Sequence, residues 1–208
     1  KNADNSPLRI EVLIRERNVL AQVWRAAVGR VTLYLLDTNI PENVETDRWV
    51  TGHLYGGDTE TRIVQEKVLG IGGIRLLRAL DIAPSVYHLN EGHSAFLTLE
   101  LAREFLQENQ ESSFADAVNF VRQKCVFTTH TPVPAGNDTY PPDQVRSTLE
   151  TLIGEAFRRQ GYSVTEHGGA AQRHVLADGG NGRRNRVRNC HRARLGGLDR
   201  LDVGADGE

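Results

Sequence analysis

The sequence predicts an α/β protein with a largely parallel sheet, and two observations support that prediction. First, short apolar runs typical of buried strands occur at residues 31–36 (VTLYLL), 86–89 (VYHL) and 125–129 (CVFTT). Second, segments with helical periodicity stand between one run and the next. Because strands joined by crossover helices pair in parallel, we expect the three runs in one sheet with helices on its faces.

The first two strands are expected to form a hairpin. Residues 9–14 and 18–24 alternate apolar with polar side chains, and a short polar stretch, Arg15-Glu16-Arg17, separates them. The expected helices share an apolar stripe at helical spacing, and Ser113 is a candidate N-cap for the last of them. They span residues 59–80, 93–108 and 113–124.

Glycines at residues 69–73 (LGIGG) resemble a phosphate-binding loop only superficially. Such a loop follows a strand and opens a helix. Here the glycines lie inside a helical pattern, where each one costs about 1 kcal/mol relative to alanine. We therefore interpret them as sites of close helix packing.

Composition excludes several classes of protein. The chain has 208 residues, 39% hydrophobic and 25% charged, with a net charge of -2, so nothing attracts it globally to nucleic acid or to anionic membranes. No apolar stretch approaches the roughly 18 residues of a membrane span. Cys125 and Cys190 lie in unrelated contexts, which favours a reducing, cytoplasmic location over a disulfide framework. The absence of methionine suggests a piece of a longer protein.

Polar residues follow two of the expected strands at their carboxyl ends. Asn90-Glu91-Gly92-His93 follows residues 86–89, and Thr129, His130 and a proline turn follow the last strand. A helix N-cap at Asn90 and a stiffened turn at His130 are the plain alternatives. Ligands of open α/β sheets bind beyond the carboxyl ends of the strands, so the joint interpretation is one wall of a cleft.

The C-terminal part follows a different pattern. Residues 142–166 suggest a helix and a strand. Residues 167–208 hold eight arginines, nine glycines and no aromatic residue, so we expect a mostly unstructured tail with few contacts and no sheet pairing to the body. Its arginine run could bind phosphate backbones, although such runs are more often simply solvated. The histidines lack the spacing of a zinc site, and no metal is expected.

Several long blocks, in one order, resemble the α-glucan (glycogen, starch and maltodextrin) phosphorylases, in particular the bacterial branch with a short YGGD loop. The resemblance covers residues 6–138 and departs at Asn137, where that branch usually has histidine. Residues 1–141 are thus expected to be a partial N-terminal domain, followed by segment 142–166 and tail 167–208. The blocks are WRAAVGRVTLYLLDTNIPEN, DRWVTGHLYGGDTETRIVQEKVLGIGGIRLLRAL, VYHLNEGHSAFLTLE and CVFTTHTPVPAG.

The resemblance implies a GT-B fold, in which this chain supplies part of the N-terminal Rossmann-like domain. Family members cleave the terminal α-1,4 bond of a glucan with orthophosphate, release glucose 1-phosphate and retain configuration. Pyridoxal phosphate, bound to a lysine of the second domain, supplies the proton relay. The resemblance implies that His130 contacts the sugar and that the stretch from Asn90 to His93 lines the neighbouring pocket. The loop from Tyr55 to Asp58 would gate access, with Arg62 following it on the helix. The implied substrate-binding residues are thus His130, Thr129, Asn90, Glu91, His93, Asp58 and Arg62.

One absence limits what the resemblance implies. The family's cofactor lysine lies in a Gly-Thr-Gly-Asn-Met-Lys context, and none of Lys1, Lys67 or Lys124 does. No cofactor is therefore expected on this fragment, which should be inactive alone. The alternative is a fused or frame-shifted product with a nucleic-acid-binding remnant, because residues 148–169 faintly resemble Mrr-type restriction endonucleases, although the lysine that such a domain needs is missing after His167.

Overall fold

The computed structural model describes residues 4–54, 56–130, 140–141, 144–145, 147–149, 162–164, 191–192 and 203–205. The chain divides into two compact units, Lys1–Ala83 and Pro84–Glu208, and each unit is described by itself. Helices and strands occur in both, which confirms the α/β class.

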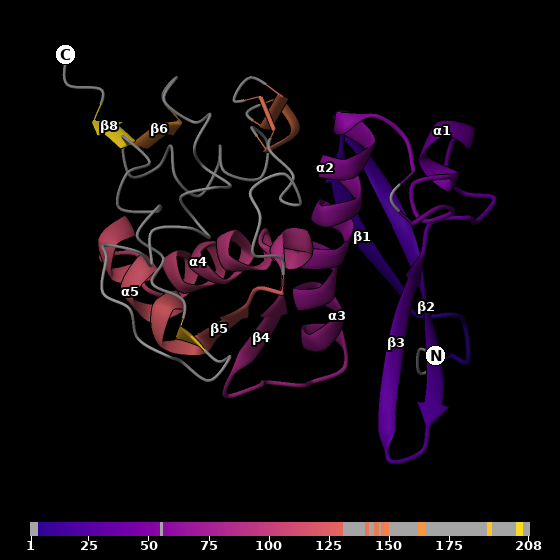
Figure 1. The fold of residues 1–208 in the computed structure, drawn as a ribbon, viewed down its shortest axis with the longest axis horizontal. Coiled ribbons are helices and arrows are strands. Elements are labelled where there is room, and N and C mark those ends of the chain that lie inside the picture. The colour runs from indigo at the N-terminus through magenta and orange to yellow at the C-terminus, as the bar shows by residue number, and fades with distance from the viewer. Residues whose placement is uncertain are drawn as a thin grey trace. The chain divides into compact units, whose positions relative to one another are not determined.

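The first unit is built on a three-stranded antiparallel sheet in the order β1-β2-β3 (Figure 1). The expected hairpin joins the first two strands through Arg15 and Glu16, whose φ angles are 49° and 61°. Two left-handed residues give a turn whose twist matches that of the strands. The second turn uses Gly29, at φ 59°. The strands are β1 (Arg9–Ile14), β2 (Arg17–Val28) and β3 (Val31–Asp37).

The helices of the first unit include one long helical segment against the sheet. It begins at α2 (Thr59–Lys67), passes through the π-helical turn η1 (Val68–Gly72) and ends as α3 (Gly73–Ala79). The short helix α1 (Glu45–Arg48) precedes it. Both η1 and α3 contact β1, and η1 also contacts β3. The core between them is fully buried and aliphatic: Val12, Ile14, Ile63, Val64, Ile71 and Ile74.

The prediction that residues 31–36 join the parallel sheet and are buried on both faces is wrong. β3 pairs antiparallel with β2, and its Val31, Leu33 and Leu35 are 53%, 44% and 53% exposed. The reason is the length of the hairpin: β1 pairs with β2 only between Arg17 and Gln22, so the distal part of β2 and β3 extends beyond β1. An apolar run indicates a strand, but it does not say which strand lies beside it.

The packing interpretation of the glycine cluster is confirmed at Gly72 but not at Gly73. A Cβ atom built there would lie 3.2 Å from Leu36 Cδ1 and 3.3 Å from Val12 Cγ2, whereas one at Gly73 would meet nothing within 4 Å. Gly72 is thus the point where the helix comes closest to the sheet.

Gly72→Val should therefore destabilise the first unit, and Gly73→Val should not. Overpacking at residue 72 is expected to lower the free energy of unfolding by about 1 to 3 kcal/mol. The same side chain at residue 73 enters open space and should cost less than about 0.5 kcal/mol. Urea unfolding followed by tryptophan fluorescence measures both, because Trp24 and Trp49 lie in the first unit. Equal losses in the two variants would refute the close approach.

Lys67, at the end of α2, has a fully buried side chain. Burial, with a smaller effect of the Arg75 charge, lowers its pKa from 10.5 to about 8. Between these two pH values the unfolded chain binds the proton that the folded chain has lost. Stability should consequently rise as the pH increases across that window.

The expected rise is on the order of 3 kcal/mol between pH 8 and 10.5. Lys67→Met should flatten it, because methionine fills a similar space without a titrating group. Urea midpoints by tryptophan fluorescence at several pH values are the measurement. A wild-type urea midpoint that stays level or falls between pH 8 and 10.5 would show that the pKa of Lys67 is not lowered.

The second unit contains the predicted parallel pair, β4 (Tyr87–Asn90) and β5 (Cys125–Thr128). Between them the chain forms the 3-10 helix η2 (Gly92–Ser94), then α4 (Leu97–Glu108) and α5 (Phe114–Lys124). The two long helices contact each other, with the Phe105 and Phe120 rings stacked at 4.8 Å. Ser113 caps α5 as predicted: its side chain accepts from the Asp116 N–H, and the Asp116 carboxylate accepts from the Ser113 N–H.

Three short strands belong to the C-terminal part: β6 (Tyr162–Val164), β7 (His191–Arg192) and β8 (Val203–Ala205). β6 pairs with β8, and β7 pairs antiparallel with β5. The expectation of no sheet pairing between tail and body is therefore wrong at β7. Backbone groups along a strand edge can pair with any extended segment, whatever its side chains. The rest of tail 167–208 lies outside the described residues.

The segment 142–166 is described in part. Residues 144–145 and 147–149 are helical and β6 falls where a strand was expected. No helix in the described part of the chain is long and apolar enough to cross a membrane.

Candidate functional site

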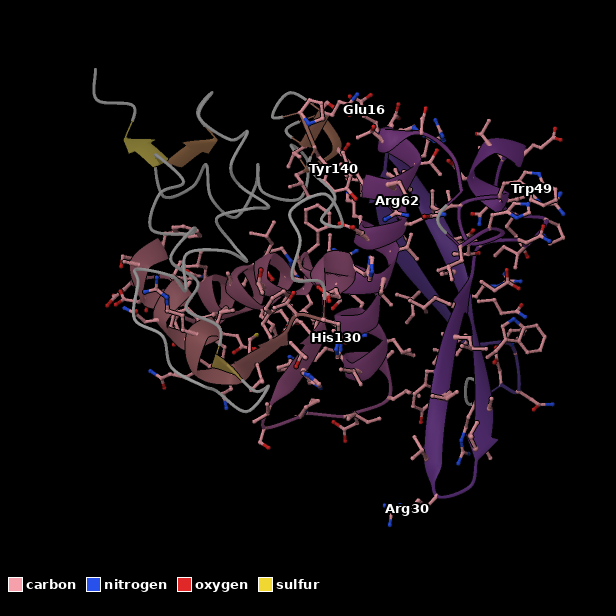
Figure 2. The ribbon with its side chains drawn as sticks, viewed as in Figure 1. Glu16, Arg30, Trp49, Arg62, His130 and Tyr140 are labelled. Atoms are coloured by element: carbon pink, nitrogen blue, oxygen red, sulfur yellow. The ribbon has the colours of Figure 1, made fainter. Side chains whose placement is uncertain are left out.

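The candidate site lies at the carboxyl ends of β4 and β5, where Figure 2 labels His130. The parallel register places Asn90 directly opposite Thr128, so the segments that leave the two strands start side by side. Alternation along β4 buries Tyr87 and Leu89 and exposes His88 and Asn90. The strand thus anchors itself through its apolar side chains and presents its polar ones on the other face.

Hydrogen bonds join the two strand ends. The Nε2 atom of His130 lies 2.7 Å from the Oδ1 atom of Asn90. The main-chain N–H of His130 donates to the Glu91 carboxylate, and the N–H of Glu91 donates to the Thr128 carbonyl at 2.9 Å. The exposed imidazole of His130 is therefore held by β4 and by the residue that follows it.

His88 belongs to the same face, although the sequence interpretation did not include it. Its Nε2 atom lies 2.6 Å from the Oγ1 atom of Thr128. The two-residue period of a strand was the available signal, because it places His88 and Asn90 on one side once residues 87 and 89 are assigned to the core.

The helix-cap alternative for Asn90 and Glu91 is wrong. Glu91 stands at the N-cap position of η2 and Phe96 at that of α4, and neither helix has a side-chain cap. Asn90 bonds His130 across the strands instead. The half-buried His93 lies within η2, and the exposed Thr129 lies between β5 and His130.

Asp58 and Arg62 lie in the first unit, and Figure 2 labels Arg62 on α2. Asp58 is the N-cap of that helix: its Oδ1 atom accepts from the backbone N–H and the hydroxyl of Thr61, both at 2.8 Å. These bonds, the backbone one first, lower the pKa of Asp58. Helix capping explains its position without a ligand, and its part in binding stays a prediction.

The polar residues at the two strand ends, here called the strand-end cluster, are His88, Asn90, Glu91, Thr128 and His130. Their chemistry suits a neutral ligand that is rich in hydroxyl groups. Amide, imidazole and hydroxyl groups can each donate or accept, and the one carboxylate, that of Glu91, is bonded to a main-chain N–H. In the described residues no three histidine, cysteine or acidic side chains gather as metal ligands. The site is therefore one of hydrogen bonding rather than of concentrated charge.

Comparison with known proteins identifies the family of this chain. The chain is 48% identical to a maltodextrin phosphorylase of Thermococcus litoralis over 147 residues, 71% of this chain and 17% of that protein. It is 44% identical to a glycogen phosphorylase of Mycobacterium tuberculosis over 164 residues, 76% of this chain and 19% of that protein. No family model matches.

A third relative is a glycogen phosphorylase of Aquifex aeolicus, 37% identical over 134 residues, 64% of this chain and 19% of that protein. The resemblance to the α-glucan phosphorylases is thus confirmed, and the chain fits a fragment of such a phosphorylase. It spans about a fifth of the length of the curated relatives it matches.

The lysines in the described residues do not fit pyridoxal phosphate, the cofactor that the family implies. The side chain of Lys67 is fully buried in the first unit. The Nζ atom of Lys124 lies 5.8 Å from the centre of the Phe120 ring. Full burial at Lys67 and an aromatic neighbour at Lys124 do not suit a lysine that an aldehyde must reach, so no step is derived through the cofactor here.

Proposed function

We propose that this chain is part of an α-glucan phosphorylase and that its β4–β5 strand ends form one wall of the glucan site. The reaction would be cleavage of an α-1,4-glucan by orthophosphate to glucose 1-phosphate. The phosphorylase relatives support the reaction class, and the bond between His130 and Asn90 across paired strands supports the site.

His130 is proposed as the residue that contacts the sugar. With Asn90 Oδ1 as acceptor, the hydrogen of the neutral imidazole lies on Nε2, and Nδ1 is left as an acceptor for a sugar hydroxyl. The Asn90 amide nitrogen adds two donors. Thr129, Glu91 and His93 are proposed to line the pocket beside it.

The finer assignments are part of the same proposal. We propose a GT-B architecture in which residues 1–141 are part of the N-terminal Rossmann-like domain, and segments 142–166 and 167–208 stand outside the family pattern. The loop that ends at Asp58 is proposed to gate substrate access, and Arg62, which follows it on α2, is proposed to bind substrate beside it. We also propose that this fragment carries no cofactor, has no membrane partner and is located in the cytoplasm.

The chain alone should not release glucose 1-phosphate from maltodextrin and orthophosphate. Its described lysines do not fit the cofactor, and the chain spans about a fifth of its relatives. A coupled assay with phosphoglucomutase and a dehydrogenase, with and without added pyridoxal phosphate, measures the rate. Phosphate-dependent turnover above the no-protein control would refute this expectation.

A segment exchange tests the proposed function. Residues 6–138 of this chain would replace the matching segment of the maltodextrin phosphorylase of Thermococcus litoralis, to which the chain is 48% identical. We expect the exchanged enzyme to keep phosphorolysis within about tenfold of the parent, since the polar strand ends are supplied intact. A folded, pyridoxal phosphate-loaded enzyme that has lost turnover altogether would count against the proposal.

Neither the relatives nor the described residues support the alternative of a nucleic-acid-binding or nuclease remnant. Most of residues 148–169, on which it rested, lie outside the described residues. The alternative is therefore not carried further.

A further inference from the structure

Glu91 has an unusual backbone conformation for its residue type. Its φ is 58° and its ψ is -165°, a region that residues with a side chain rarely adopt. Such a conformation persists only where the surroundings hold it, and it occurs preferentially at functional sites. At this point the chain leaves β4 and turns into η2.

Two hydrogen bonds from Glu91 reach the other strand end. Its N–H donates to the Thr128 carbonyl at 2.9 Å, and its carboxylate accepts the main-chain N–H of His130. Both partners lie where the chain leaves β5. Glu91 thus closes a ring of bonds that extends the β4–β5 ladder by one residue beyond Asn90 and Thr128.

Hydrogen bonds hold His130 at two points, its main chain and its imidazole. The side chain of His130 is exposed, so little packing fixes its orientation. Its ring is bonded to Asn90, and its main chain is bonded to the Glu91 carboxylate. A carboxylate is a stronger acceptor for a main-chain N–H than a neutral group is, so the bond from Glu91 is a substantial support for the His130 main chain.

We propose that Glu91 is a positioning residue: its left-handed backbone turns the carboxylate onto the His130 N–H and thereby fixes the imidazole against Asn90. As a pocket-lining residue Glu91 would contact the glucan itself. As a positioning residue it affects the glucan only through His130. The bonds between Glu91 and the end of β5 exist without a ligand. The positioning role rests on the proposed function only in taking a sugar as the group that His130 contacts.

Amide hydrogen exchange in the full, ligand-free chain tests this directly. In Glu91→Ala the His130 amide should exchange at least about tenfold faster, because its charged acceptor is gone. Glu91→Gln retains an acceptor oxygen and should give an intermediate rate. Glu111→Ala, which removes an exposed carboxylate between α4 and α5, should leave the rate within twofold.

The strain offers a second, independent measurement. Glycine adopts a φ near 58° readily, so Glu91→Gly should unfold at a urea concentration no lower than Glu91→Ala, while its His130 amide exchanges as fast. A general loosening would also speed exchange at the Phe127 and Val126 amides. We expect those rates to stay within twofold.

A His130 amide that is equally protected in wild type, Glu91→Ala and Glu91→Gly would overturn the proposal. So would faster exchange spread evenly over β4 and β5, which would indicate structural damage only. Failure of the chain to bind maltodextrin would contradict the proposed function and leave the exchange result standing.

Discussion

His130→Asn in the exchanged phosphorylase should lower kcat/KM by about 100-fold to 1000-fold. A single well-placed hydrogen-bonding group at a reacting site typically contributes that much. Asparagine keeps a polar atom near the Nδ1 position, but it lacks the ring Nε2 whose bond to Asn90 holds the side chain at the strand ends. Steady-state phosphorolysis of maltodextrin measures the loss.

The matched control is Glu111→Gln, in the loop between α4 and α5, which should change kcat/KM by less than twofold. An unchanged KM with a reduced kcat would place the contact mainly in the transition state. If His130→Asn and Glu111→Gln retained equal activity, His130 would not contact the sugar.

Arg103→Ala should destabilise the second unit by about 3 to 5 kcal/mol, because it removes the ion pair that Arg103 forms with a buried carboxylate. The Glu100 side chain is 0% exposed, and Arg103 binds it with two bonds, Nε to Oε2 at 2.9 Å and Nη2 to Oε1 at 2.7 Å. The bonds to Glu100 raise the pKa of Arg103. Circular dichroism during urea unfolding, with hydrogen exchange at α4 amides, measures the loss.

Two further variants separate the ion pair from general disruption of α4. Gln107→Ala removes a second hydrogen-bond partner of Arg103, at 2.6 Å on the exposed side, and should cost less than about 1 kcal/mol. Glu100→Gln combined with Arg103→Ala should recover part of the loss, since no buried charge remains. A double variant as unstable as Arg103→Ala would contradict the explanation.

The local elements were predictable because local chemistry determines them. Ser113 and Asp116 stand three residues apart before an apolar stripe, which defines a capping box. The parallel pairing of β4 and β5 followed from the helices between them. The glycines of residues 69–73 were predictable as packing sites because they lie within a helical pattern, and the structure places the close approach at Gly72.

The partner of β3 was not predictable in the same way. The run VTLYLL is apolar on both faces of the strand, with Thr32 as the exception. Such a run is typical of a buried central strand. Its neighbour is set by the turn at Gly29 and by the length of the hairpin, both of which favour antiparallel pairing with β2. The alternating pattern ending at residue 24 gave no sign that β2 continues to Val28.

The site was predictable in position but not in its internal bonds. Two polar strand ends on one edge follow from parallel pairing, and they led to Asn90 and His130. The positive φ of Glu91 has no sequence signal, because left-handed positions usually carry glycine or asparagine. Without it, nothing in the sequence directs the Glu91 carboxylate to the His130 N–H.

The central claim is that the β4–β5 strand ends bind glucan, and titration of the labelled full chain with maltoheptaose tests it most directly. Two-dimensional NMR would follow the His130 imidazole and the Asn90 side-chain amide, with the amides of α5 as an internal reference. We predict saturable shifts at both groups in the millimolar range, with α5 unchanged, and their loss in His130→Asn. Resonances of His130 and Asn90 that stay unchanged at saturating maltoheptaose, or that shift no more than α5, would contradict the account.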